Sequence, residues 1–129
     1  MAELTPVVLA LSNAGAPMAR RIAGALGLPL HGRAGRVAEA DVHFANALDH
    51  VRDLFLAGRP VIGVCAAGIL VRAIGPHLGD KRRDPPVLAV ADDGSVVVPL
   101  IGGHHGANRL AQQLADLLGA QAAVTTAGD

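Results

Sequence analysis

The sequence predicts an α/β fold: a three-layer, Rossmann-like sandwich with a mostly parallel, mixed sheet that contains one β-hairpin. Three observations lead to this prediction. Short, unbroken apolar runs are typical of strands buried on both faces of a sheet. These runs alternate with segments whose apolar residues recur at helical spacing, which is typical of a layered α/β sheet. The turn Asp92-Asp93-Gly94 joins two apolar runs with no helix between them, and this indicates a hairpin.

The elements follow one another closely enough that residues 1–129 are expected to form a single domain. Strands are expected at residues 6–11, 28–31, 60–65, 87–91, 95–101 and 122–126. Helical spacing of apolar residues occupies residues 18–26, 45–57, 69–74 and 110–118. Residues 32–41 are small and polar and are expected to form a loop, and residues 79–86 form a charged connector.

The hairpin makes the sheet mixed, because one of its two strands must run against the other. Which strand runs against the rest of the sheet is open from the sequence alone. The connector at residues 79–86 could span roughly 25 Å if extended, enough to cross the sheet, so we favour residues 87–91 as the antiparallel strand. Asn13, Cys65, His104 and Thr125 would then share one rim of the sheet, where open α/β sheets usually bind ligands.

Composition excludes several classes of function. The 11 basic and 11 acidic residues cancel, so no electrostatic footprint for nucleic acid is present. Aromatic residues make up only 2% of the chain, which leaves few side chains on which bases could stack. The single Cys65 excludes an internal disulfide framework. No signal peptide and no membrane-spanning apolar run is apparent, so a cytoplasmic protein with no membrane partner is expected.

The stretch Ile-Gly-Gly-His-His-Gly-Ala-Asn at residues 101–108 is the most informative part of the sequence. It follows an apolar run and precedes a helical pattern, so it predicts a strand, a glycine-rich turn and the start of a helix. Glycines allow a ligand to approach the backbone, and a helix start favours an anion. His104 and His105 add side chains that titrate near neutral pH. A tight connection with two solvated histidines is the alternative interpretation.

A second glycine-containing stretch runs from Gly63 to Gly68. Its spacing imitates a phosphate-binding loop, but Ile69 and Leu70 stand where that loop requires Lys and Ser or Thr. Cys65, at a strand end before a helix, could be a reactive thiolate, although a small buried residue is the favoured interpretation. The histidines show no metal-ligand spacing, so no metal site is expected.

Four segments, taken together and in order, resemble the N-terminal domain of CbiG-type cobalt-precorrin-5A hydrolases. They are residues 63–72 (GVCAAGILVR), 81–87 (KRRDPPV), 99–111 (PLIGGHHGANRLA) and 124–129 (VTTAGD). A similar module also occurs fused ahead of precorrin-3B C-17 methyltransferase. The family loop often carries Ser where Gly102 stands here, and the turn in this chain is one Gly shorter.

The resemblance implies a role in cobalamin biosynthesis: opening of the lactone of a cobalt-precorrin with release of acetaldehyde. His104, with His105 second, matches the loop histidine expected to transfer protons. No cofactor is expected, because any cobalt belongs to the corrinoid substrate. Expected partners are that substrate and either other cobalamin-biosynthesis enzymes or the remaining domains of full-length hydrolases. The alternative is a non-catalytic corrinoid-binding or docking module. The substrate-binding residues expected are Asn13, Gly63, Cys65, Ala66, Gly68, Arg72, Lys81, Gly102, Gly103, Gly106, Asn108, Thr125 and Thr126.

Overall fold

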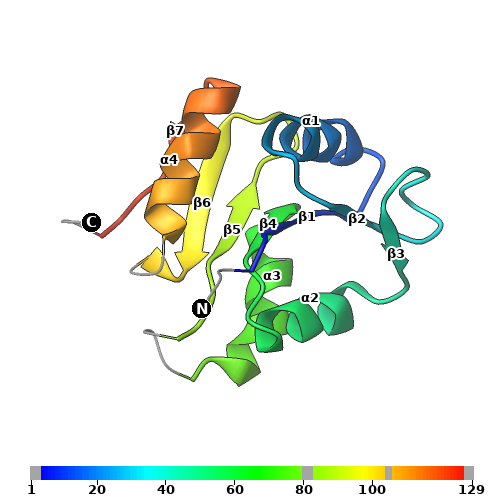
Figure 1. The fold of residues 1–129 in the computed structure, drawn as a ribbon, viewed down its shortest axis with the longest axis horizontal. Coiled ribbons are helices and arrows are strands. Elements are labelled where there is room, and N and C mark those ends of the chain that lie inside the picture. The colour runs from blue at the N-terminus through cyan, green and yellow to red at the C-terminus, as the bar shows by residue number, and fades with distance from the viewer. Residues whose placement is uncertain (1–3, 80–82, 104–105, 127–129) are drawn as a thin grey trace.

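The computed structural model describes residues 4–79, 83–103 and 106–126. In this part of the chain, seven strands form one sheet in the order β3-β2-β1-β4-β5-β6-β7 (Figure 1). The elements in chain order are β1 (Val7–Ala10), α1 (Ala16–Leu26), β2 (Leu30–Arg33), β3 (Val42–Phe44), α2 (Ala47–Leu56), β4 (Val61–Val64), α3 (Ala67–Ile74), the 3-10 helix η1 (Gly75–His77), β5 (Val87–Val90), β6 (Val96–Ile101), α4 (Ala107–Leu118) and β7 (Gln121–Ala122).

Two helical layers cover the sheet, which confirms the predicted three-layer sandwich. α1 and α4 pack on one face, and α2 and α3 pack on the other (Figure 1). Successive strand residues face opposite layers. In β1, for example, Val8 lies in the core beneath α1, while Val7 and Leu9 lie in the core beneath α2 and α3. Full burial on both faces explains why β1, β4 and β5 are unbroken apolar runs in the sequence.

The strand directions define two rims of the sheet. β1 to β5 run parallel, whereas β6 pairs antiparallel with β5 and β7 pairs parallel with β6. We call the rim where β1 to β5 end the carboxyl rim. The opposite rim, where β1 to β5 begin and where β6 ends, is the amino rim.

The prediction that residues 87–91 form the antiparallel strand is therefore wrong: β6 reverses direction instead. β5 pairs in parallel with β4, with Val87 opposite Val61. α3 has already carried the chain from the carboxyl rim back to the amino rim, so the connector at 79–86 has no need to cross the sheet. β4, α3 and β5 thus form an ordinary βαβ unit.

Three strands differ from the prediction. β2 is Leu30–Arg33, two residues later than the strand expected at 28–31. β3 was not predicted: it lies between the loop expected at 32–41 and the helix expected at 45–57, and only Phe44 of this edge strand is buried, so its sequence contains no apolar run. β7 contains only Gln121 and Ala122, whereas a longer strand at 122–126 was expected. β7 pairs with the start of β6, near the carboxyl rim. The residues after Ala122 then continue toward the amino rim, where Thr125 and Thr126 line the pocket described below.

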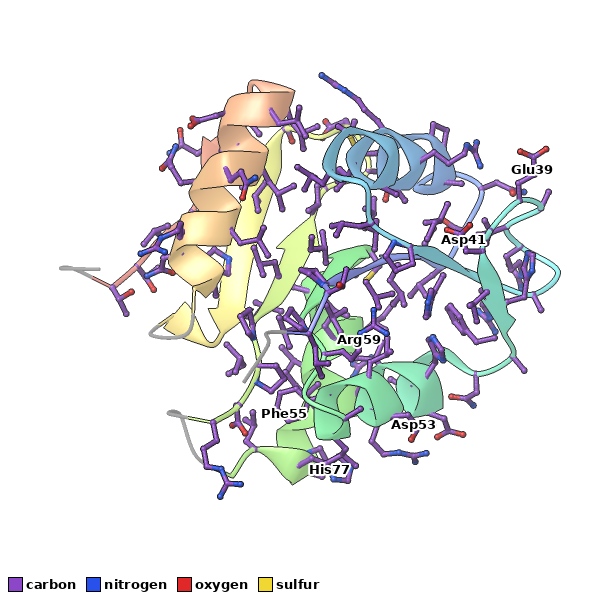
Figure 2. All side chains as sticks on the ribbon, viewed as in Figure 1. Glu39, Asp41, Asp53, Phe55, Arg59 and His77 are labelled. Carbon is purple, nitrogen blue, oxygen red and sulfur yellow. The ribbon has the colours of Figure 1, made fainter. Side chains whose placement is uncertain are left out.

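A pair of histidines, one on β2 and one on α2, links α2 to the sheet. His31 on β2 is buried, and its Nδ1 lies 2.8 Å from Nε2 of His50 on α2, within hydrogen-bonding distance. The ring of His50 stacks on that of Phe44, with ring centroids 4.4 Å apart. Burial lowers the pKa of both histidines. The charges of His50 and Arg59 lower that of His31 further, while Asp41 opposes the shift at His31 and Asp53 opposes it at His50 (Figure 2).

We expect the stability of the domain to fall at mildly acidic pH. Because the folded state lowers both pKa values, the unfolded chain takes up protons at higher pH than the folded chain does. The unfolding free energy should therefore fall as the pH drops through about 6.5, the ordinary histidine pKa, and level off once the folded pair is also protonated. Urea midpoints measured by circular dichroism between about pH 8 and pH 5 would show this dependence.

The variant His50→Gln removes one of the two titrating groups and should flatten this pH dependence. His77→Gln, which alters a histidine of η1 outside the pair (Figure 2), should retain it. Equal slopes in wild type and His50→Gln would contradict the account.

Candidate functional site

A pocket of about 330 Å³ opens at the amino rim, where β6 ends and α4 begins. We call it the amino-rim pocket. Its walls come from four segments of the chain: the residues after η1, the connector before β5, the end of β6 with the following loop and the start of α4, and the segment after β7. The lining residues are Leu78, Gly79, Asp84, Pro99, Leu100, Ile101, Gly102, Gly103, Asn108, Thr125 and Thr126.

Gly102 shapes the pocket through a close backbone approach. Its φ of +85° lies in the left-handed region, which favours glycine. A Cβ atom at this position would lie 2.7 Å from Cα and 2.8 Å from N of Pro86. The chain leaving β6 therefore lies directly against the buried prolines that lead into β5. The Pro86 carbonyl in turn accepts a hydrogen bond from the Val61 N–H at 2.9 Å, which holds this segment on β4.

The start of α4 forms the next wall. Gly106 is its N-cap, with a φ of +100° and no side-chain cap. The Ala107 N–H donates to the Gly102 carbonyl at 3.0 Å, which closes the loop on itself. Asn108 is buried, and its Nδ2 donates to Oγ1 of Thr126 at 2.7 Å. This bond ties the segment after β7 to α4, so the C-terminal threonines lie at the same pocket as the glycine loop.

The structure thus brings together five of the residues predicted to bind substrate. They are Gly102, Gly103, Asn108, Thr125 and Thr126. His104, His105 and Lys81 lie outside the described residues, so their predicted roles stay predictions. In the chain, the two histidines stand directly between Gly103 and Gly106.

Asp84 also lines the pocket, although it was not among the predicted site residues. Its carboxylate is half-buried, and Oδ2 accepts the Gly79 N–H at 3.3 Å. Among the described residues that line the pocket, Asp84 has the only ionisable side chain. In the sequence it stands at the end of a short charged run, and this position predicts a side chain exposed to solvent. Its position next to Pro85 and Pro86, which are buried, was the signal that could have singled it out.

The other predicted residues lie elsewhere, so the common rim that we expected is wrong. Because β6 reverses direction, its glycine loop lies at the amino rim, whereas the loop after β4 lies at the carboxyl rim. Asn13 lines a separate hollow near residues 34–38, and Arg72 is exposed on α3 outside the amino-rim pocket. The predicted residues at or near the carboxyl rim are Asn13, Gly63, Cys65, Ala66 and Gly68.

Packing accounts for Gly63 without a ligand. A Cβ on Gly63 would lie 2.9 Å from Cδ1 of Leu70 and 3.1 Å from Sγ of Cys65, so this glycine lets α3 pack closely on β4. Burial, with a smaller contribution from the negative charge of Asp92, raises the pKa of the Cys65 thiol to about 12. This favours the interpretation of Cys65 as a packing residue, because a reactive cysteine requires a lowered pKa.

Two further features bear on the kind of site. Within residues 4–79, 83–103 and 106–126, no group of three or more His, Cys, Asp or Glu side chains is arranged to hold a metal ion. In the same ranges, no helix has both the length and the apolar character needed to cross a membrane.

Fold and pocket together define a three-layer α/β domain whose candidate site lies at the amino rim, beside a reversed hairpin strand. Residues 49–129 match the family described as Cobalamin synthesis G N-terminal. The chain belongs to this family, which confirms the resemblance drawn from the sequence motifs.

Two relatives are named cobalt-precorrin-5A hydrolase. The protein from Salmonella typhimurium is 34% identical over 121 residues, which cover 92% of this chain and 34% of the relative. The protein from Priestia megaterium is 39% identical over 77 residues, which cover 59% of this chain and 21% of the relative. The matched part of the chain therefore spans about a third of the length of the first relative and about a fifth of the second.

A solved structure shares the fold. The crystal structure of a cobalamin biosynthesis protein G homolog from Sulfolobus solfataricus superposes with a TM-score of 0.71 at 19% sequence identity. The superposition covers 94% of this chain and 36% of the homolog.

We expect Gly102→Ala to destabilise the domain. The substitution forces a side chain into a left-handed conformation and against the Pro86 backbone, so the unfolding free energy should fall by at least about 2 kcal/mol. Gly68→Ala is the matched control, because a Cβ there meets nothing within 4 Å and Ala is the better helix former. Denaturant titration of both variants measures the difference. A wild-type midpoint for Gly102→Ala would show that the loop does not depend on this contact.

Proposed function

We propose that this chain acts in cobalamin biosynthesis, in the hydrolytic opening of the lactone of a cobalt-precorrin with release of acetaldehyde. One observation carries the proposal. Three of the four segments that resemble the family converge on the amino-rim pocket, although they are separated in the sequence. The names and identities of the Salmonella and Priestia relatives support the same reaction.

The size of the pocket suggests which part of the substrate it would take. At about 330 Å³, it is at the lower end of the range for small-molecule sites and smaller than a corrinoid macrocycle. We propose that the reacting edge with the lactone enters the pocket, while the rest of the macrocycle stays outside. Since the chain spans only part of its relatives, further domains in those proteins would cover the remainder.

Hydrolysis of a lactone requires two proton transfers. The oxygen of water bonds to the acyl carbon as the water loses a proton, and the ring oxygen takes up a proton as the acyl–oxygen bond breaks. The products of this step are a carboxylate and an alcohol, and a carbon–carbon bond must then break to release acetaldehyde. We propose His104 for the proton transfers, with His105 as the second candidate, because both follow Gly103 of the pocket in the chain.

The described residues supply binding and orientation for these steps. The positive end of the α4 dipole lies at the pocket and would favour negative charge on the acyl oxygen. The Asn108 side chain and the C-terminal threonines offer uncharged polar groups. Asp84 holds the connector through the Gly79 N–H, and we propose that it positions the charged residues that precede it. Any cobalt in this scheme belongs to the substrate.

The experiment is an acetaldehyde assay with the cobalt-precorrin lactone, comparing the wild-type chain with its variants. His104→Ala should lower kcat by about a hundred- to ten-thousand-fold, the usual contribution of a general acid or base. His105→Ala should lower kcat by a smaller factor. His77→Ala, outside the amino-rim pocket, serves as the control and should keep wild-type turnover. The pH–rate profile should contain a limb near neutrality that disappears in His104→Ala.

Two outcomes would count against the proposal. Near-normal turnover in His104→Ala would move the proton transfers to another residue. Tight binding of the substrate with no acetaldehyde from the wild-type chain would instead favour a non-catalytic corrinoid-binding module.

A further inference from the structure

A second and larger cavity, of about 690 Å³, lies at the amino rim beside α4. We call it the α4 cavity. Most of its wall is apolar and comes from the starts of β1, β4 and β5 and from α4. The lining residues are Leu4, Pro6, Ala57, Gly58, Pro60, Arg83, Asp84, Pro85, Pro86, Gly106, Arg109, Leu110 and Gln113.

Positive charge exceeds negative charge in this wall. The wall contains two arginines, Arg83 and Arg109, and one carboxylate, that of Asp84. This carboxylate already accepts a hydrogen bond from the Gly79 N–H. Within the described part of the chain, neither arginine has a carboxylate within 4.0 Å or another hydrogen-bond partner. Both residues are exposed, so their guanidinium groups are available to a ligand.

Arg109 stands where the helix itself disfavours it. It is the third residue of α4, whose first turn contains no acidic residue. A cation near a helix N-terminus interacts unfavourably with the helix dipole. The fold therefore carries a local electrostatic cost that no described residue offsets. Such local conflicts are typical of functional positions, where a ligand supplies the missing charge.

The two cavities are neighbours. Asp84 lines both, and the single loop between β6 and α4 contributes Gly102 and Gly103 to the amino-rim pocket and Gly106 to the α4 cavity. Asp84 and this loop therefore form part of the walls of both cavities.

We propose that the α4 cavity binds an organic carboxylate with an aliphatic body, through Arg83 and Arg109. The carboxylate pairs with the guanidinium groups, and the aliphatic body packs against the prolines and Leu110. This inference rests on the proposed function, since the carboxylate is an arm of the substrate whose lactone edge lies in the amino-rim pocket. The apolar wall distinguishes this ligand from inorganic phosphate, which has no apolar part to bury.

The test is a titration of the isotope-labelled chain with hexanoate, followed by two-dimensional amide NMR, with hexanamide as the uncharged match. Hexanoate should shift the amide signals of Gly58, Gly106, Leu110 and Gln113, and hexanamide should bind at least about tenfold more weakly. Arg109→Gln and Arg83→Gln should each weaken hexanoate binding by about tenfold. Arg20→Gln, on the exposed surface of α1, is the control and should bind as wild type does.

Equal shifts with hexanoate and hexanamide, or unchanged affinity in both arginine variants, would overturn the proposal. Absence of shifts at these amides would also overturn it. The outcome is independent of turnover, because the titration measures binding alone. With an active enzyme, Arg109→Gln should raise KM for the lactone substrate and leave kcat nearly unchanged. This is the expected effect of losing an interaction that is equally strong in the bound substrate and in the transition state.

Discussion

The contact between Gly102 and the backbone of Pro86 is the constraint on which the amino-rim pocket depends. It joins the strand that reverses direction to the segment that enters the sheet in parallel. From this contact the chain turns into α4, and Asn108 then draws the C-terminal threonines onto the same helix start. The connector before β5, the β6–α4 loop and the residues after β7 therefore meet at one place, because Gly102 has no side chain and lets its backbone lie against that of Pro86.

The layered fold could be predicted because its causes are local. Strands buried on both faces must be apolar throughout, so β1, β4 and β5 are visible as runs such as Val87–Val90. The hairpin is visible because Asp92-Asp93-Gly94 satisfies the turn chemistry without help from the rest of the fold. β3 escaped prediction for the opposite reason: an edge strand buries little, and only Phe44 shows the pattern.

The position of the site could be predicted only in part, because it depends on strand direction. The connector at 79–86 is long enough for either direction, and the deciding fact is that α3 has already returned the chain to the amino rim. Two glycine motifs that look alike in sequence thus lie at opposite rims, and Gly63 serves the packing of Leu70. Asp84 was missed because its burial arises from folding of the connector against the glycine loop, and the two prolines that follow it were the only local signal of this packing.

We propose that ligand binds at the amino rim, the reverse of the usual arrangement in open α/β sheets. The most direct measurement is amide NMR mapping of the labelled chain with diamagnetic cobalt(III) cobyrinic acid, a corrinoid that carries free carboxylates. If ligand binds at the amino-rim pocket, shifts should cluster at Gly79, Gly102, Gly103 and Thr126. Shifts clustered instead at the carboxyl rim, around Asn13 and Ala66, would contradict it.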